Sequence, residues 1–230
     1  MKKTALLLFT MFTVLMQAQE FKQIPMVNVS GEGKVKVVPD QVSISISVES
    51  KGTVAADVKK ENDAKIDAVL KFIKKSNIAA ADYQTQRVSL NPNYDYEKKK
   101  HNYIATQTVV VLLRDLSKYD VLMDGLVDTG INRIDNVEFK SSKILELQSE
   151  ARKLAIKDAK AKAEDFVSAL GQKIGKAVVV SDNSQNYYPP RPMMYAMKTM
   201  AADGGAEARE TLAAGEMEVV INVSVSFMLE

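Results

Sequence analysis

One segment constrains the fold of this chain more than any other: residues 41–48 alternate strictly between apolar and polar side chains. The apolar positions after Gln41 are Val42, Ile44, Ile46 and Val48, and the positions between them are Ser43, Ser45 and Ser47. Because successive side chains of a strand point to opposite faces, this pattern predicts a strand with one buried and one open face. Such strands are typical of antiparallel sheets, so the folded domain is expected to begin in antiparallel sheet.

Another predicted strand lies just before it, within residues 27–37, and contains Gly31 and Gly33 on either side of Glu32. These glycines lack the third glycine and the strand-to-helix context of a phosphate-binding loop. They favour a bulge or a tight bend in the strand. Pro39 and Asp40 predict a turn between the two strands.

The first 18 residues have the organisation of a cleavable secretory signal. Lys2 and Lys3 are followed by an apolar run over residues 5–16 and by the small residue Ala18. The apolar run is too short to span a bilayer comfortably, and no stop-transfer pattern follows it. Cleavage after Ala18 would leave one domain of residues 19–230; an uncleaved N-terminal anchor is the alternative.

Charge and cysteine content exclude several classes of function. The chain has 31 Lys and Arg against 29 Asp and Glu, and loss of the two leader lysines would balance them. A balanced surface argues against nucleic acid as a partner, since nonspecific binding to it needs a basic face. The absence of cysteine excludes disulfides, thiol redox chemistry and thiolate metal sites, so stability must come from packing.

Apolar residues at helical spacing predict three helices, over residues 53–75, 116–129 and 142–170. Asn62 falls on the apolar stripe of the first helix and is expected to be a hydrogen-bonded or rim-exposed amide rather than a ligand-binding residue. Gly130 stands where the second helix needs a left-handed cap. The third helix is expected to bury Leu147, Ala151, Leu154, Ala155, Ala159, Ala163, Phe166 and Leu170, and its alanines would permit close approach to a sheet.

The remaining strands are predicted over residues 82–91, 102–114, 134–140, 174–181 and 216–228, with a charged hairpin tip over residues 94–101. The order of elements suggests a duplication. Strand 41–50, helix 53–75 and the next two strands form one βαββ unit; strand 134–140, helix 142–170 and the last two strands form another. Two such units predict an α+β fold in which antiparallel sheets carry helices on one face.

A long irregular loop, residues 182–215, precedes the last strand and is expected to be mobile or ordered only by a partner. It contains the one unusual cluster of side chains: Tyr187, Tyr188, Met193, Met194, Tyr195, Met197 and Met200. Thioethers are soft ligands that suit Cu(I), and they oxidise reversibly to sulfoxide. The cluster could equally be a hydrophobic contact for a partner subunit or membrane, or a loop of biased composition with no role.

Taken together, these features resemble the SIMPL-domain family of bacterial envelope proteins, which includes periplasmic immunogenic proteins. The match rests on an ordered set of short motifs spread over residues 26–229: Ser30 to Gly33 with Pro39 and Asp40, Gln84 and Thr85, Asn91 to Tyr96, Val109 to Leu116, Gly130 to Ile134, Asp158 to Ala163, Ala169 to Gly171, and Gly215 to Val219. The resemblance implies an α+β fold and export to the periplasm, with association to the outer membrane in some members. It also implies ring-forming oligomers in some members and a link to oxidative-stress defence in others.

No catalytic constellation is recognisable in the chain. His101, the only histidine, lies in the lysine-rich hairpin tip with no nucleophile elbow beside it. Carboxylates such as Asp57, Glu61, Asp63 and Asp67 alternate with lysines along one helix, which is typical of a solvated face. We therefore predict no catalytic, cofactor or metal-binding residue and do not expect an enzyme.

Two classes of function remain. The first is a non-enzymatic envelope protein that acts through self-assembly into a homo-oligomer, with a role in oxidative-stress protection and peripheral contact with the outer membrane. The second is a periplasmic binding module for a peptide, lipid or small molecule. Assembly predicts exposed apolar patches on sheet edges and on the 182–215 loop, whereas a binding module predicts one concave pocket.

Overall fold

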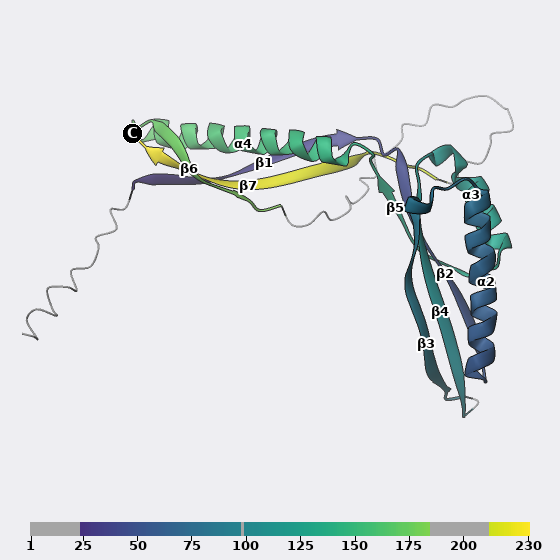
Figure 1. Ribbon diagram of the computed structural model, residues 1–230. Coiled ribbons are helices and arrows are strands. Elements are labelled where there is room, and N and C mark those ends of the chain that lie inside the picture. Colours follow the sequence, from purple (N-terminus) through teal and green to yellow (C-terminus); the bar gives the residue numbers. More distant parts are fainter. Residues whose placement is uncertain (1–23, 98, 185–211) are drawn as a thin grey trace, which may run out of the picture.

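The computed structural model describes residues 24–97, 99–184 and 212–230, which form an L of two arms (Figure 1). Each arm is an antiparallel sheet with a long helix on one face, so the α+β prediction is confirmed. The three-stranded arm has the strand order β1 (Met26–Val37), β7 (Met217–Leu229), β6 (Ile174–Asp182), covered by α4 (Ile144–Ala169). The four-stranded arm has the order β3 (Tyr83–Asp95), β4 (Lys100–Leu113), β2 (Gln41–Gly52), β5 (Arg133–Lys140), covered by α2 (Ala55–Lys75) and α3 (Tyr119–Asp128).

The two arms are not consecutive in the chain. The prediction that strand 134–140 shares a βαββ unit with helix 142–170 is wrong, because β5 pairs with β2 in the four-stranded sheet. Val137 and Phe139 of β5 pack against the core under α2, which is where their apolar surface is buried. The place of β5 in the second βαββ unit is taken by β1, which pairs with β7 over its whole length. The four-stranded arm is therefore inserted between β1 and α4.

The alternation of β2 is confirmed. Its aliphatic side chains Val42, Ile44, Ile46 and Val48 are at most 1% exposed. They form the centre of a core completed by α2, α3 and β4. Asn62 of α2 is 1% exposed, and its amide nitrogen donates to the carbonyls of Val48 and Ala105 at 2.9 and 3.3 Å. Its oxygen has no partner among the described residues, so the amide is buried and only partly hydrogen-bonded.

The glycines of β1 serve close packing and not a bulge. The pairing of β1 with β7 contains no register shift, which contradicts the bulge or bend expected from the sequence. A Cβ atom on Gly31 would lie 2.0 Å from the backbone oxygen of Ala155, and one on Gly33 would lie 1.9 Å from that of Ala151. The backbone of α4 thus rests directly on β1, as its alanines four residues apart predict.

Helix α4 buries a narrower stripe than the sequence suggests. The buried residues are Ala151, Ala155, Ala159, Ala163 and Val167. Leu154, Phe166 and Leu170 were expected in the core but are 40, 60 and 71% exposed. A single helix lying on three strands contacts them through one line of residues, so apolar side chains beside that line remain in solvent.

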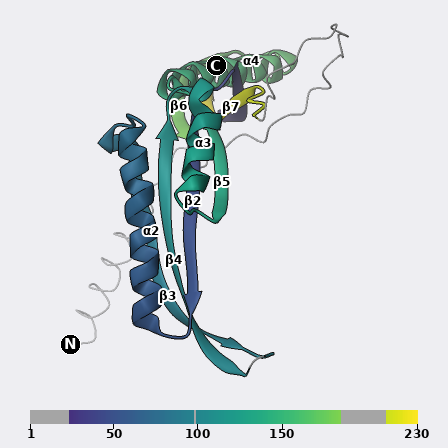
Figure 2. The same cartoon turned by 90° about the vertical axis from the view of Figure 1, so that its right-hand side faces the viewer.

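The hairpin β3–β4 is longer than predicted. Asn91, Pro92 and Asn93 lie inside β3, with Pro92 opposite Tyr103, and the strands continue to Asp95 and Lys100. Proline is tolerated because β3 is an edge strand and needs no hydrogen bond on its outer side. The hairpin extends beyond the end of α2 (Figure 2).

The helices lie on the outer sides of the L, and both open sheet faces look into its inner angle (Figure 1). On the four-stranded sheet this inner face carries Ser43, Ser45 and Ser47 of β2 and, opposite them on β4, Leu112, Val110 and Thr108. The connection between β1 and β2 and the connection between β5 and α4 meet at the corner of the L. We call this corner the elbow.

Candidate functional site

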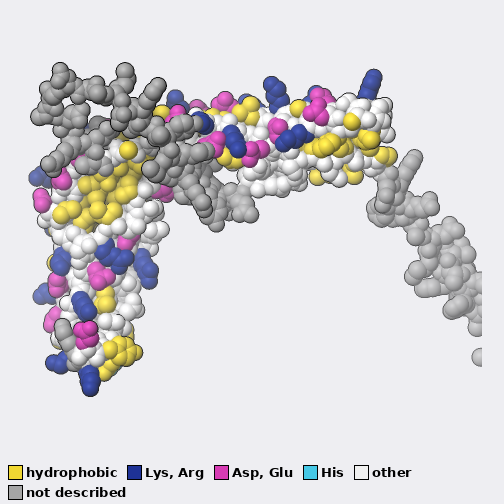
Figure 3. All heavy atoms as spheres, turned by 180° about the vertical axis from the view of Figure 1, so that it is seen from behind, with side chains coloured by type: hydrophobic (Ala, Val, Ile, Leu, Met, Phe, Trp, Pro, Cys, Tyr) yellow, Lys and Arg dark blue, Asp and Glu magenta, His cyan; other side chains and the backbone are white. Residues whose placement is uncertain are grey.

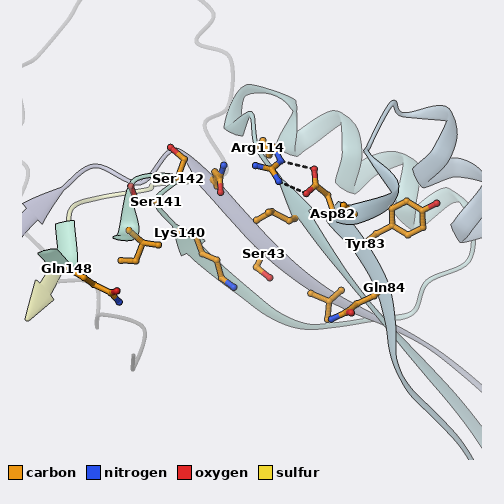
Figure 4. Close-up of a pocket in the computed structure, with 14 residues that line it drawn as sticks. Ser43, Asp82, Tyr83, Gln84, Arg114, Lys140, Ser141, Ser142 and Gln148 are labelled. Carbon is orange, nitrogen blue, oxygen red and sulfur yellow. Dashed lines mark hydrogen bonds and ion pairs between the residues drawn. The ribbon is translucent and has the colours of Figure 1, made fainter. Parts of the chain in front are cut away.

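A cavity of about 640 Å³ opens at the elbow, and we call it the elbow pocket. It lies on the open face of the four-stranded sheet, beside the first turns of α4 (Figure 4). Its volume is in the range of about 300–1,000 Å³ that is usual for small-molecule sites. The lining residues are Gln41, Ser43, Ala81, Asp82, Tyr83, Gln84, Val110, Leu112, Arg114, Lys140, Ser141, Ser142, Ile144 and Gln148.

Strand register brings the polar groups of the pocket into rows. Gln41 pairs with Lys140 of β5, and Arg114 follows Leu113, which pairs with Val42. Arg114, Gln41 and Lys140 therefore form one row across the sheet. The next row, deeper into the arm, holds Leu112 and Ser43.

Arg114 is held in place by Asp82, the last residue of a short 3-10 helix (Ala80–Asp82) that directly precedes β3. Its Nε and Nη2 donate to the two carboxylate oxygens at 2.7 and 2.6 Å. The Asp82 side chain is 7% exposed, whereas that of Arg114 is 60% exposed. Hydrogen bonding to Arg114 holds the pKa of Asp82 below its usual value and raises the pKa of the guanidinium. The pair therefore stays ionised at neutral pH and fixes one edge of the guanidinium.

Gln41 is the most unusual residue of the pocket. It is 8% exposed, yet no described residue hydrogen-bonds to its side-chain amide. Among the described residues, the fully buried side-chain atoms without a partner belong to Ser50 and Asn62, so the Gln41 amide is not sealed off from solvent. Its remaining access is to the pocket, which makes Gln41 a free hydrogen-bonding group aimed at whatever occupies that space.

Asp40, next to Gln41, joins the two arms at the elbow. Its carboxylate accepts from the backbone nitrogen of Ser142 at 2.7 Å and from the Ser142 hydroxyl, and its own nitrogen donates to the Lys140 carbonyl at 3.1 Å. The Ser142 hydroxyl lowers the pKa of Asp40. The predicted turn at Pro39 and Asp40 is thus the clamp that ties the β1–β2 connection to the β5–α4 connection.

The sequence-predicted cluster of tyrosines and methionines, Tyr187 to Met200, lies outside the described residues, as does the predicted leader. His101 lies at the start of β4, with its ring centroid 5.0 Å from that of Tyr94 in the hairpin. The carboxylates Glu61, Asp63 and Asp67 of α2 pair with Lys65, Lys59 and Lys71 one turn away, as expected of a solvated face.

Sequence reasoning missed the elbow pocket. Gln41 continues the Ser43, Ser45, Ser47 face, which predicts an open position, and its burial arises only from elements distant in the chain. Arg114 and Lys140 stand at strand ends, where charged residues are common. The Pro39–Asp40 turn was the one local signal that the chain changes direction there.

The described residues offer little for other chemistry. They contain no group of three His, Asp or Glu residues able to hold a metal ion. Among the same residues, no helix is long and apolar enough to cross a membrane.

Comparisons with known proteins find similarity over nearly the whole chain. The family model SIMPL, described as a protein of unknown function (DUF541), matches residues 27–227. The chain is 32% identical over 217 residues to the uncharacterized protein YggE of Escherichia coli, covering 93% of this chain and 87% of the relative. It is 29% identical over 213 residues to the 26 kDa periplasmic immunogenic protein of Brucella melitensis, covering 88 and 84%.

A more distant relative is the interleukin-1 receptor-associated kinase 1-binding protein 1 homolog of Xenopus laevis. It is 21% identical over 160 residues, which cover 68% of this chain and 62% of the relative. The family model spans both arms and the elbow between them, from β1 to the last strand. The chain belongs to the SIMPL family.

Proposed function

We propose that this chain is a non-enzymatic, exported envelope protein that acts through self-assembly into a homo-oligomer. The proposal places it in the periplasm, in keeping with its predicted leader and with the name of the Brucella relative. Contact with the outer membrane, and a role in oxidative-stress protection, are part of the same proposal. On the face shown in Figure 3, Lys and Arg are interspersed with Asp and Glu, which favours a protein or membrane partner over nucleic acid.

One observation carries the proposal: the edge strand β6 exposes a run of three valines beside the irregular part of its pairing with β7. Val178, Val179 and Val180 of β6 are 45, 50 and 58% exposed. An exposed apolar edge strand presents unpaired backbone groups to another chain. Such an edge favours addition of a strand from a second copy.

The other three edges carry features that discourage strand addition. Strand β1 has Lys34 and Lys36, β3 has Pro92, and β5 has Arg133 and Lys140. Strand β6 itself has Lys176 and irregular pairing before Val179, so the surface that we propose for assembly in the described part of the chain is its end at Val179 and Val180.

The test is the solution mass of residues 19–230, measured by light scattering. A double substitution, Val179→Lys with Val180→Lys, is expected to reduce an oligomer to smaller species by charging the β6 edge. Val121→Lys is the matched control, since Val121 is 75% exposed on α3 and away from any sheet edge. A monomeric wild-type protein, or an oligomer unaffected by the double substitution, would contradict the β6 proposal.

Deleting residues 184–214 and measuring the solution mass again tests whether the tyrosine and methionine cluster takes part in assembly.

The proposed role of this cluster as an oxidant sink has a separate test. Changing Met193, Met194, Met197 and Met200 to Leu should lower survival under peroxide or hypochlorite. Unchanged survival would remove that role.

The elbow pocket supports a second candidate function, a periplasmic binding module. Its volume suits a small molecule, and Gln41 offers hydrogen-bonding groups that no described residue uses. The two candidates are compatible, because the pocket and the β6 edge lie on different parts of the L.

A further inference from the structure

The lining of the elbow pocket identifies the class of ligand that it suits. Two cationic side chains, Arg114 and Lys140, stand on either side of Gln41 in one row of the sheet. They are two strand spacings apart, which is about 10 Å between backbones. Both side chains are long enough to approach a group bound above Gln41. Figure 4 shows Lys140 beside Ser43, and Arg114 turned toward Asp82.

The charge of this row disfavours a ligand with more than one negative charge. The Asp82 carboxylate accepts hydrogen bonds from Nε and Nη2 of Arg114, and no described residue hydrogen-bonds to Nη1. Lys140 has Glu138 as a neighbour, with Nζ 3.6 Å from the carboxylate. Each cation thus has one carboxylate partner, so the row has no excess positive charge, and a doubly charged phosphate would leave it two charges negative. A carboxylate adds one negative charge and could accept hydrogen bonds from Arg114 Nη1, Lys140 Nζ and the Gln41 amide.

Part of the remaining lining is apolar. Val110 and Leu112 of β4 form one wall of the pocket, and Ile144 at the start of α4 lines it as well. An alkyl or aliphatic stem placed there would bury apolar surface at roughly 25 cal/mol per Å². The pocket thus combines an anion-binding row with an adjoining apolar surface.

We propose that the elbow pocket binds a small amphipathic carboxylate, with its head at Lys140, Gln41 and Arg114 and its stem on Val110, Leu112 and Ile144. A short fatty acid and the C-terminus of an apolar peptide share this chemistry. The inference rests on the second candidate function, the binding module, and is independent of assembly through β6.

The experiment is equilibrium dialysis of the 19–230 protein against four probes: octanoate, octanamide, and the tripeptide acetyl-Leu-Val-Leu as the free acid and as the amide. We expect one site per chain and at least tenfold tighter binding of an acid than of its amide. Tighter binding of octanoate than of the tripeptide acid would identify the fatty acid as the preferred source, and the reverse order would identify the peptide.

Variants locate the site. Lys140→Met should weaken binding of the preferred acid about tenfold, and Gln41→Met, which preserves side-chain length, should weaken it several-fold. Lys51→Met is the control, because Lys51 lies on the same face of β2 at its other end. Thermal unfolding of each variant checks that the fold is intact.

The outcomes separate the two ideas. Equal binding of acids and amides, still weakened by Gln41→Met, would overturn the carboxylate class and leave the binding module standing. Binding of no probe would overturn both. Acid binding that neither Lys140→Met nor Gln41→Met weakens would overturn the assignment to the elbow pocket.

Discussion

At the scale of single residues, Gly31 and Gly33 show that a glycine can be required by a neighbour and not by its own backbone. The glycines with positive φ among the described residues are Gly130, Gly171 and Gly215, so neither glycine of β1 needs a left-handed conformation. What they need is room, because the backbone of α4 occupies the space of a Cβ atom. Glycine inside a strand often marks such an approach.

The prediction at this scale concerns Gly31→Ala. Because its Cβ would lie 2.0 Å from a backbone oxygen, trimming a neighbouring side chain cannot relieve the clash. We expect a loss of about 3 kcal/mol in the free energy of unfolding, measured by urea denaturation. Glu32→Ala on the same strand is the control, since its exposed side chain points to the other face; its effect should stay within about 0.5 kcal/mol. Equal effects of the two substitutions would contradict this account.

At the scale of elements, the two long helices differ in how they meet their sheets. Helix α2 buries Val58, Ile66, Val69 and Ile73 in a core shared with α3 and three strands, as its apolar stripe predicts. Helix α4 contacts β1 and β7 through alanines, so its larger apolar residues lie outside the contact line. Large apolar side chains are therefore a poor guide to the buried side of a helix when that side consists of small residues.

A pair of substitutions in α4 tests this difference. Ala159→Leu adds apolar volume at a position that is fully buried against β1, so we expect a loss of about 1–3 kcal/mol. Phe166→Gln removes a large apolar side chain that is 60% exposed, and the free energy of unfolding should change by less than about 0.5 kcal/mol. Both are measured by urea denaturation of the dilute protein. A larger loss from Phe166→Gln than from Ala159→Leu would contradict the observed face.

At the scale of the whole molecule, the elbow decides how the two arms are held. The chain crosses between them at the β1–β2 and β5–α4 connections, which are joined by Asp40. Hydrogen bonds from Ser142 stabilise the charged form of Asp40 and lower its pKa. A lowered folded pKa gives a stabilisation that is present above the unfolded pKa of about 3.9 and is lost as the pH falls through the folded value.

We therefore expect the arms to become less tightly oriented below about pH 4. The absence of cysteine allows two spin labels to be placed specifically, at Lys75→Cys on α2 and Lys160→Cys on α4. Electron–electron distance measurements at neutral pH should give a narrow distribution that broadens in the Asp40→Ala variant and, for the wild type, at low pH. Asp57→Ala, which changes an exposed carboxylate of α2, should leave the distribution narrow. A distribution unaffected by Asp40→Ala would show that the elbow is held by other contacts.

The local sequence by itself determined the elements and their faces. The alternation of β2, the stripe of α2, the cap at Gly130 and the small-residue line of α4 are each properties of neighbouring residues, and each was predictable for that reason. Family membership followed from the same short motifs taken in order.

Only the tertiary structure decided which elements share a sheet and where a pocket opens. Strand β5 pairs with β2 although about ninety residues separate them, and the backbone of Glu32 donates to Asp158 across 126 positions. Such contacts depend on which other element packs against each apolar face, and a local sequence pattern does not contain that information. The elbow pocket has the same origin. The neighbours of Gln41 in the sequence predict a solvent-exposed position, but Gln41 is buried because β4, β5 and α4 converge around it.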